Sequence, residues 1–405
     1  MQPLLKNRPV IIIGFMLCLP VLVLLMTDFT AHFISDERTN SVAFGRDFIN
    51  YYNSSIYILE NRVLDLFDRD QYWEFIRHIY GPDMSTHSWS YPPHMWFLTW
   101  PLALMPYLNA FVVWTFLGCL AFYKAAKTYT LNRFDAVVLL LAPAGLICIA
   151  AGQNGLFTSA LLIAAFSVKD MRPRLAGILI GCLSIKPQLG VLIPLVLILM
   201  RDWKVITWAG LTVLNLIASS ILVFGIAPWI LFMKEVYSFQ VEVLEQMGAP
   251  FSHMVPSLFM GAKLYGLPVS TAKILQLLSS AFALCIILWA FWKKRDYNLQ
   301  LAILFIATAL FSPYIVNYDL SFLSVSAYLY YRHMQNSPSH LTRLHYWLIG
   351  FVGSCAILTF LLSALNIHLT WFVLMGFALC VIKEMKLLGA ETYKKPILPK
   401  LRDLI

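Results

Sequence analysis

One lysine interrupts the apolar stretch that covers residues 175–200. Lys186 stands in the middle of this stretch and is followed by Pro187 and Gln188. A charged side chain inside a bilayer costs at least about 2.5 kcal/mol, so it marks a functional site by default. Pro187 interrupts the helix and Gln188 adds amide donors, so Lys186 and Gln188 could bind the phosphate of a donor substrate. The alternatives are a lysine that snorkels to the membrane surface or one that pairs with a buried acid.

Asp47 stands directly before a segment with helical periodicity. Aspartate is a favoured helix cap, and this role alone would explain its position. A carboxylate held near the membrane surface could equally serve as a catalytic base. The apolar side chains that follow recur on one face and predict an amphipathic helix on the membrane surface: Phe48, Tyr52, Ile56, Leu59, Val63 and Leu66.

Further polar and aromatic residues fall in expected turns between apolar segments. Turn chemistry and an aromatic belt at the membrane interface explain their residue types without any function. They are nevertheless all expected on one side of the membrane, together with Asp47, which is where a shared site would need them. The candidates for lining a substrate cleft are Tyr91, His94, Gln153, Asn154, His253, Tyr318 and Asp319.

The composition indicates which elements must position these residues. Hydrophobic residues make up 60% of the 405 residues and charged residues only 13%, which is typical of a membrane protein and not of a soluble domain. Repeated apolar stretches predict an all-α bundle of transmembrane helices. The net charge of +9 comes from short basic clusters between these stretches, so it indicates membrane topology and no nucleic-acid partner. The seven cysteines all lie in apolar stretches and indicate neither a disulfide framework nor a metal site.

Assigning the basic clusters to the cytoplasm predicts a consistent topology of about 12 spans. Residues 10–26 are expected to form a retained first span, since no cleavage site of small residues follows them. Residues 28–90 form the first extracytoplasmic loop, with interfacial helices, and residues 389–405 form a basic cytoplasmic tail. Residues 175–200 begin and end at cytoplasmic basic residues, which predicts a hairpin of two short helices broken at Lys186. The whole chain, 1–405, is one integral membrane domain with both termini in the cytoplasm.

Several short motifs, in their order and spacing, resemble glycosyltransferase family 87, also described as DUF2029, within the GT-C class of membrane glycosyltransferases. The resemblance implies a GT-C helical bundle in the plasma (inner) membrane. It also implies a polyprenyl-phosphate sugar donor, often a mannose donor, and a hydroxyl of a glycolipid or glycan as acceptor. The motifs that carry it are Gly45-Arg46-Asp47-Phe48 with Tyr51 and Tyr52, Tyr91-Pro92-Pro93, Gly152-Gln153-Asn154-Gly155, the stretch from Leu175-Ala176-Gly177 to Lys186-Pro187-Gln188, and Ser312-Pro313 through Tyr318-Asp319.

The resemblance also implies an acidic residue in the first outer loop, and Asp47 occupies the matching position. Six other aspartates of the same loop stay open as alternatives: Asp28, Asp36, Asp65, Asp68, Asp70 and Asp83. The expected reaction is a single displacement with inversion on the extracytoplasmic face, in which Asp47 takes the proton of the acceptor hydroxyl. Some relatives have a histidine where this chain has Asn317 and Tyr318, so that histidine's role does not transfer. No cofactor is expected, although a divalent metal ion stays open because some GT-C enzymes use one.

Two other classes of protein remain as alternatives. A transporter or flippase of a lipid-linked sugar would also use an intramembrane lysine and a broken hairpin. The large amphipathic outer loop and the single clear helix interruption favour the transferase. A membrane scaffold without chemistry predicts that Asp47 and Lys186 can each be replaced without loss of function.

Overall fold

The computed structural model describes residues 45–81, 84, 87–293, 295–337 and 341–387. Within these residues the chain is helical and contains no strand, which confirms the predicted all-α class. The expected first span at 10–26 and the tail at 389–405 lie outside the described residues. The same is true of residues 28–44 of the expected outer loop.

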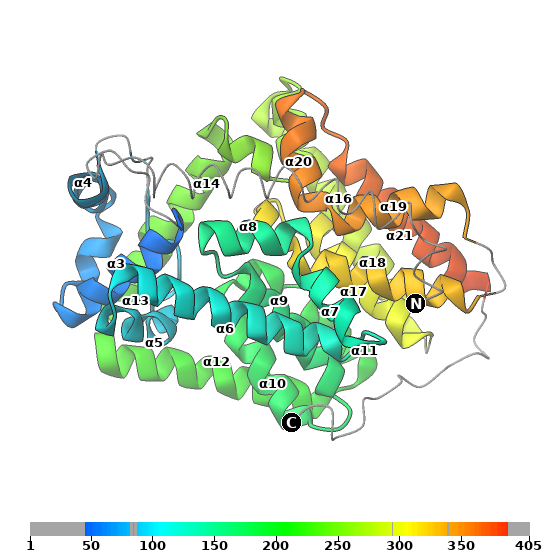
Figure 1. Cartoon of the computed structure of the whole chain (residues 1–405), viewed down its shortest axis with the longest axis horizontal. Coiled ribbons are helices and arrows are strands. Elements are labelled where there is room, and N and C mark those ends of the chain that lie inside the picture. The colour runs from blue at the N-terminus through cyan, green and yellow to red at the C-terminus, as the bar shows by residue number, and fades with distance from the viewer. Residues whose placement is uncertain (1–44, 82–83, 85–86, 294, 338–340, 388–405) are drawn as a thin grey trace.

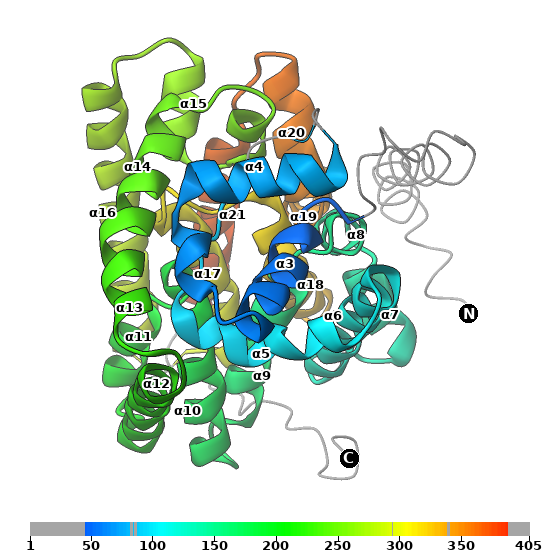
Figure 2. The same cartoon turned by 90° about the vertical axis from the view of Figure 1, so that its left-hand side faces the viewer.

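The first described segment gathers at one end of the molecule, on the left of Figure 1. Figure 2 looks onto this end and shows α4, α3 and α5 one below another. Helix α3 contacts η1, α5 and η3, so residues separated in sequence form one packed unit with its own buried core. The elements of this segment are α3 (Phe48–Leu59), η1 (Val63–Phe67), α4 (Arg69–Tyr80), η2 (Pro93–Met95), α5 (Trp96–Thr99) and η3 (Trp100–Leu104).

The middle of the chain alternates long helices with short, broken ones. Proline is the first residue of both α8 and η5. At this position the backbone N–H has no partner within the helix, so its absence in proline costs no hydrogen bond. The same proline cannot continue the preceding helix, which therefore ends before it. The elements are α6 (Tyr107–Lys127), α7 (Arg133–Leu140), α8 (Pro143–Ala151), α9 (Gly155–Val168), α10 (Pro173–Cys182), η4 (Leu183–Ile185), η5 (Pro187–Leu189), α11 (Ile193–Met200) and α12 (Trp203–Phe224).

A second set of short helices follows α12 and leads into the C-terminal bundle. Here α17 contacts α16, α18 and α21. The elements are α13 (Ala227–Leu231), the π-helical η6 (Phe232–Val236), α14 (Tyr237–Gln246), η7 (Phe251–Met254), α15 (Leu258–Leu264), α16 (Val269–Trp292), α17 (Tyr297–Phe311), η8 (Asn317–Leu320), α18 (Ser321–Gln335), α19 (Arg343–Gly353), α20 (Cys355–Ala364) and α21 (Thr370–Leu387).

Helices α17 and α12 differ in how much of their surface is buried in the bundle. Helix α17 is buried on nearly every face, as expected of an apolar helix at the centre of a membrane protein. Helix α12 packs against α10, yet Val205 is its only buried apolar residue; the others are partly or fully exposed, including Leu214 and Leu222. Exposed apolar side chains along a long helix indicate a surface that faces lipid.

The predicted number of spans is not confirmed. Among the described residues, three helices are individually long and apolar enough to cross a membrane: α6, α12 and α16. The total rises to five if the bent pairs α7–α8 and α19–α20 each count as one span. Four further apolar helical segments have only 10–17 residues: α9, α17 and the two segments 173–185 and 187–200 that contain α10 and α11.

The first outer segment also differs from the prediction of one amphipathic surface helix. Helix α3 ends at Leu59, and Asn61 adopts a left-handed backbone with φ of 55°. Leu59, expected on the apolar face, is 52% exposed, whereas Ser54 and Ser55 are fully buried. The serines tolerate burial because their hydroxyls donate to the carbonyls of Tyr51 and Tyr52 within the same helix.

Candidate active site

Lys186 lies at the break between η4 and η5. The residue before a proline is disfavoured in the α region, and Lys186 adopts φ of −135° and ψ of 77°. The ends of the surrounding segment are held together, because Lys169 Nζ lies 3.1 Å from Asp202 Oδ2. The two ends of the segment therefore lie side by side, and Lys186 stands at the break between its two halves. This arrangement agrees with the predicted broken hairpin.

A buried ion pair fixes the lysine. Lys186 Nζ donates to Asp319 Oδ1 at 2.5 Å, and the two side chains are only 6% and 2% exposed. The rings of Tyr91 and Tyr318 face the ammonium group, with centroids at 5.8 and 5.0 Å. Of the alternatives that the sequence left open for Lys186, the pairing with a buried acid is therefore present. It joins two predicted site residues that are 133 positions apart.

Asp47 sits at the start of α3, but its side chain makes no capping hydrogen bond. Its backbone N–H donates to Ala151 O at 3.0 Å, and its Oδ2 accepts from Gln153 Nε2 at 2.9 Å. Ala151 is the last residue of α8, and Gln153 lies in the turn between α8 and α9. The carboxylate is thus held by a tertiary contact, which the capping interpretation does not explain.

A chain of hydrogen bonds leads from Asp47 toward Lys186. Tyr51 donates its hydroxyl hydrogen to Gln153 Oε1 at 2.9 Å, so the 2.6 Å contact between the Tyr51 and Tyr91 hydroxyls must use the hydrogen of Tyr91. Each donor therefore points toward Asp47, an arrangement that stabilises a negative charge on its carboxylate. Burial raises the pKa of Tyr51 and of Tyr91, so both phenols stay protonated and keep donating.

From the sequence, Tyr51 was expected only as one of the residues that carry the family resemblance, with no role of its own in the site. The signal that could have identified it is its position four residues after Asp47, since residues at this spacing lie on the same face of a helix. Without the contact to Gln153, however, nothing distinguished it from the neighbouring Tyr52.

The remaining predicted residues are placed differently. His94 is buried beside the hairpin, where its Nε2 lies 3.1 Å from Ser184 Oγ. Burial lowers the pKa of His94 to about 4, which keeps the ring uncharged near neutral pH.

Asn154 is fully buried, and its amide atoms have no hydrogen-bond partner among the described residues. The side chain of Gln188 is partly exposed, and within the described residues no hydrogen bond joins it to the Lys186 side chain, which bonds to Asp319. His253 packs against Phe360, outside the hydrogen-bond chain.

A close approach of two backbones holds the Asp319 turn against the Gln153 turn. A Cβ atom on Gly155 would lie 2.0 Å from Tyr318 O and 2.8 Å from Cys148 Sγ. We therefore expect Gly155→Ala to force η8 away from α9 and to destabilise the protein by about 1–3 kcal/mol, as overpacking does elsewhere. Thermal unfolding of the detergent-solubilised variant measures this effect.

Gly350→Ala is the matched control, because among the described residues no atom outside the backbone of its own helical turns lies within 4 Å of the added Cβ. It should leave the melting temperature unchanged or raise it slightly, since alanine favours a helix by up to ~1 kcal/mol over glycine. Equal melting temperatures for Gly155→Ala and wild type would show that the two turns are not in contact.

Among the described residues, no group of three or more histidine, cysteine, aspartate or glutamate side chains is arranged to hold a metal ion. The charged side chains at the site are Asp47, Lys186 and Asp319. What this arrangement offers chemically is a partly exposed carboxylate oxygen at one end and a buried ammonium group at the other.

The fold and the site together define a helical membrane protein with a charged site between a broken hairpin and two turns. The chain belongs to glycosyltransferase family 87, whose family model matches residues 89–313, more than half of its length. It is therefore a membrane glycosyltransferase. The match includes Tyr91, Gln153 and Lys186, whereas Asp47 precedes it and Asp319 follows it. Comparison with curated proteins and with solved structures gives no match.

Proposed function

We propose that the protein transfers a hexose, most simply mannose, from a polyprenyl-phosphate donor to a hydroxyl of a glycolipid or glycan. The observation that carries this proposal is the hydrogen-bond chain from the Asp47 carboxylate to Tyr91, whose ring centroid lies 5.8 Å from the buried Nζ of Lys186. A displacement at an anomeric carbon needs a base for the acceptor and positive charge for the phosphate that leaves. Asp47 and Lys186 supply these two groups.

Asp47 is the general base of the proposed reaction. Its Oδ2 is occupied by Gln153, and no described residue donates a hydrogen bond to Oδ1. Oδ1 takes the proton of the acceptor hydroxyl while that oxygen forms a bond to the anomeric carbon. The bond between this carbon and the phosphate oxygen breaks, so the polyprenyl phosphate leaves and the configuration inverts.

Lys186 binds the phosphate while remaining paired with Asp319. An ammonium group has three hydrogens, and among the described residues only Asp319 accepts a hydrogen bond from Nζ. Buried donors without acceptors are costly, so the other two hydrogens favour an anionic ligand. The pair with Asp319 holds Nζ in place, and its position beside the Tyr91 ring puts the phosphate at the end of the chain that starts at Asp47. We place the site on the extracytoplasmic face of the plasma membrane, with both termini in the cytoplasm.

The test is a transfer assay with purified protein in lipid vesicles. Radiolabelled polyprenyl-phosphate mannose, glucose and galactose are supplied one at a time with a glycolipid extract. Label that moves from one of these lipids into a new product supports the proposal. If all three labelled lipids stay intact while a labelled nucleotide sugar is consumed, the proposed donor class is wrong.

The hydrogen bonds around Gln153 provide a further prediction. Tyr51→Phe removes the hydroxyl that orients Gln153 and leaves a buried acceptor unpaired, which costs about 1–3 kcal/mol. We expect the transfer rate to fall about tenfold with little change in the affinity for the donor. Steady-state kinetics at varied donor concentration separate the two effects.

Tyr57→Phe is the control, because Tyr57 is a buried tyrosine of the same helix outside this chain of hydrogen bonds. It should transfer sugar at the wild-type rate. If both variants lost the same fraction of the transfer rate, the loss would come from removing any buried tyrosine hydroxyl of α3. The orientation of Gln153 would then not explain it.

A further inference from the structure

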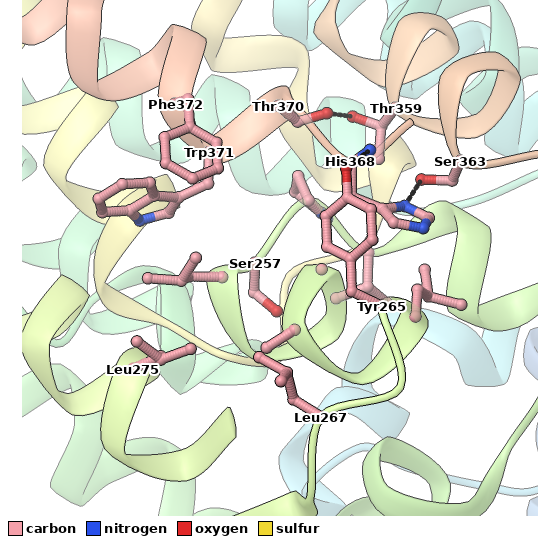
Figure 3. A pocket seen from close by; sticks show the side chains of 16 residues that line it. Ser257, Tyr265, Leu267, Leu275, Thr359, Ser363, His368, Thr370, Trp371 and Phe372 are labelled. Atoms are coloured by element: carbon pink, nitrogen blue, oxygen red, sulfur yellow. Dashed lines mark hydrogen bonds between the residues drawn. The ribbon is translucent and has the colours of Figure 1, made fainter. Parts of the chain in front are cut away.

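A cavity of about 160 Å³ lies among α15, α16, α20 and the start of α21 (Figure 3). Most of its wall is apolar and includes Leu258, Leu275 and Trp371. The cavity is distinct from the site at Asp47 and Lys186, since none of the residues of the hydrogen-bond chain lines it. Helix α20, which forms one wall, also packs against η8, the element that carries Asp319.

The polar side chains in the cavity wall are largely satisfied by one another. Thr359 and Thr370 share a hydrogen bond at 3.2 Å, and His368 Nδ1 lies 3.2 Å from Ser363 Oγ, as Figure 3 shows. His368 is only 7% exposed, and its Nε2 has no partner among the described residues. Burial lowers the pKa of His368, so the imidazole is neutral and adds no charge to the cavity.

These features select the kind of occupant. A buried water needs two to four polar partners, so a largely apolar cavity with one free ring nitrogen does not hold water well. Apolar cavities of roughly 150 Å³ bind small apolar groups. The rim includes Tyr265, Leu267 and Phe372, which are 56%, 42% and 50% exposed, and α16 is long and apolar enough to span a membrane. The opening therefore suits a hydrocarbon chain that enters from the bilayer.

We propose that this cavity binds the end of an acyl chain of a membrane phospholipid. The chain fills the apolar volume against Leu275 and Trp371 and is held between α16 and the start of α21. This inference does not depend on the proposed transferase reaction, because it rests on residues that take no part in it.

Photocrosslinking in vesicles tests the proposal. The full chain is reconstituted into phosphatidylcholine vesicles that contain a phosphatidylcholine with a photoreactive diazirine near the end of one acyl chain. Mass spectrometry then locates the labelled peptides. We expect label on the cavity-lining residues Leu275 and Trp371, distinguished by fragmentation from the exposed residues of the same peptides, as well as on the lipid-facing helix α12.

Leu275→Trp fills the cavity from α16 and should reduce labelling of its peptides about tenfold, the equivalent of ~1.4 kcal/mol in binding. Leu278→Trp is the control, since Leu278 lies on the same helix, is 61% exposed and does not line the cavity. Labelling of α12 should be the same in both variants. Cavity peptides that stay unlabelled in the wild type, or equal labelling in both variants, would overturn the proposal.

A second pair of variants covers the case in which Leu275→Trp does not fold. Gly261 lines the cavity, and beyond the backbone of its own helix the one described atom within 4 Å of a Cβ there is His368 Cβ, at 3.5 Å, so Gly261→Leu can extend into the cavity. Gly210→Leu makes the same change in α12, where the part of the chain that the structure describes has no atom within 4 Å of the added Cβ apart from the backbone of α12 itself. Labelling of the cavity peptides should fall in Gly261→Leu alone. Unchanged labelling in Gly261→Leu contradicts the proposal.

Discussion

Asp47→Asn should lower the rate of sugar transfer by about 10²–10⁴-fold, which is the usual contribution of a general base. Asparagine is almost the same size as aspartate and can still accept a hydrogen bond from Gln153, so α3 should stay in place against the turn between α8 and α9. The variant loses only the ability to take a proton. The transfer rate at saturating donor measures this loss, and binding of labelled donor should stay close to that of the wild type.

Asp65→Asn is a suitable control because it makes the same change in the same segment. Asp65 accepts from Arg62 Nε at 2.8 Å in an exposed ion pair, and such pairs contribute at most about 1 kcal/mol. Its transfer rate should match the wild type. A wild-type rate for Asp47→Asn would exclude Asp47 as the base, whatever the control shows.

The second large effect concerns the pair between Lys186 and Asp319. Asp319→Asn alone leaves a buried lysine without its counter-charge and should lower the free energy of unfolding by about 3–5 kcal/mol. Lys186→Ala has the converse defect and leaves the carboxylate unpaired. Denaturant unfolding in detergent micelles measures both losses.

The double variant Lys186→Met with Asp319→Asn separates stability from donor binding. It removes both charges at once, and replacement of a buried pair by neutral side chains is often close to neutral in stability. We expect stability to recover relative to Asp319→Asn while binding of the polyprenyl-phosphate donor stays lost. Donor binding at the wild-type level in this stable double variant would show that Lys186 has only a structural role.

The membrane class, the helical fold and the family could be predicted from the sequence, because hydropathy and short motifs are local signals. The helices α6, α12 and α16 are long enough to appear as clear apolar stretches. The number of spans could not be read in the same way. Pro143 and Pro187 divide apolar stretches into short, bent pieces, and apolar content alone does not tell a span from a broken or buried helix.

The candidate site was predicted as a set of residues on one side of the membrane, and the structure brings Asp47, Gln153, Tyr91, Lys186 and Asp319 together. Which residues pair could not be predicted, since the ion pair and the Gln153 contacts join positions more than 100 residues apart. His253 was also expected on this side of the membrane, but it packs against Phe360 and away from the hydrogen-bond chain. Knowing the side of the membrane does not give the distance between two residues.

The amphipathic helix shows the limit of a periodic pattern. The spacing of apolar residues predicted a helix through Leu66, and α3 does begin at Phe48 as expected. The pattern does not reveal the left-handed turn at Asn61, nor the burial of Ser54, whose hydroxyl lies 3.2 Å from Thr99 Oγ1. Packing between α3 and η3 decides which face is buried.

The central claim is that one site performs covalent sugar transfer from a lipid phosphate, with Asp47 as its base. The most direct measurement follows a radiolabelled polyprenyl-phosphate hexose in vesicles that contain either the wild type or Asp47→Asn, in a single turnover. The wild type should move label into a new glycoside, whereas Asp47→Asn should bind the donor and leave it intact. Label that crosses the bilayer on intact lipid, with no glycoside formed by the wild type, would contradict the claim and identify a transporter.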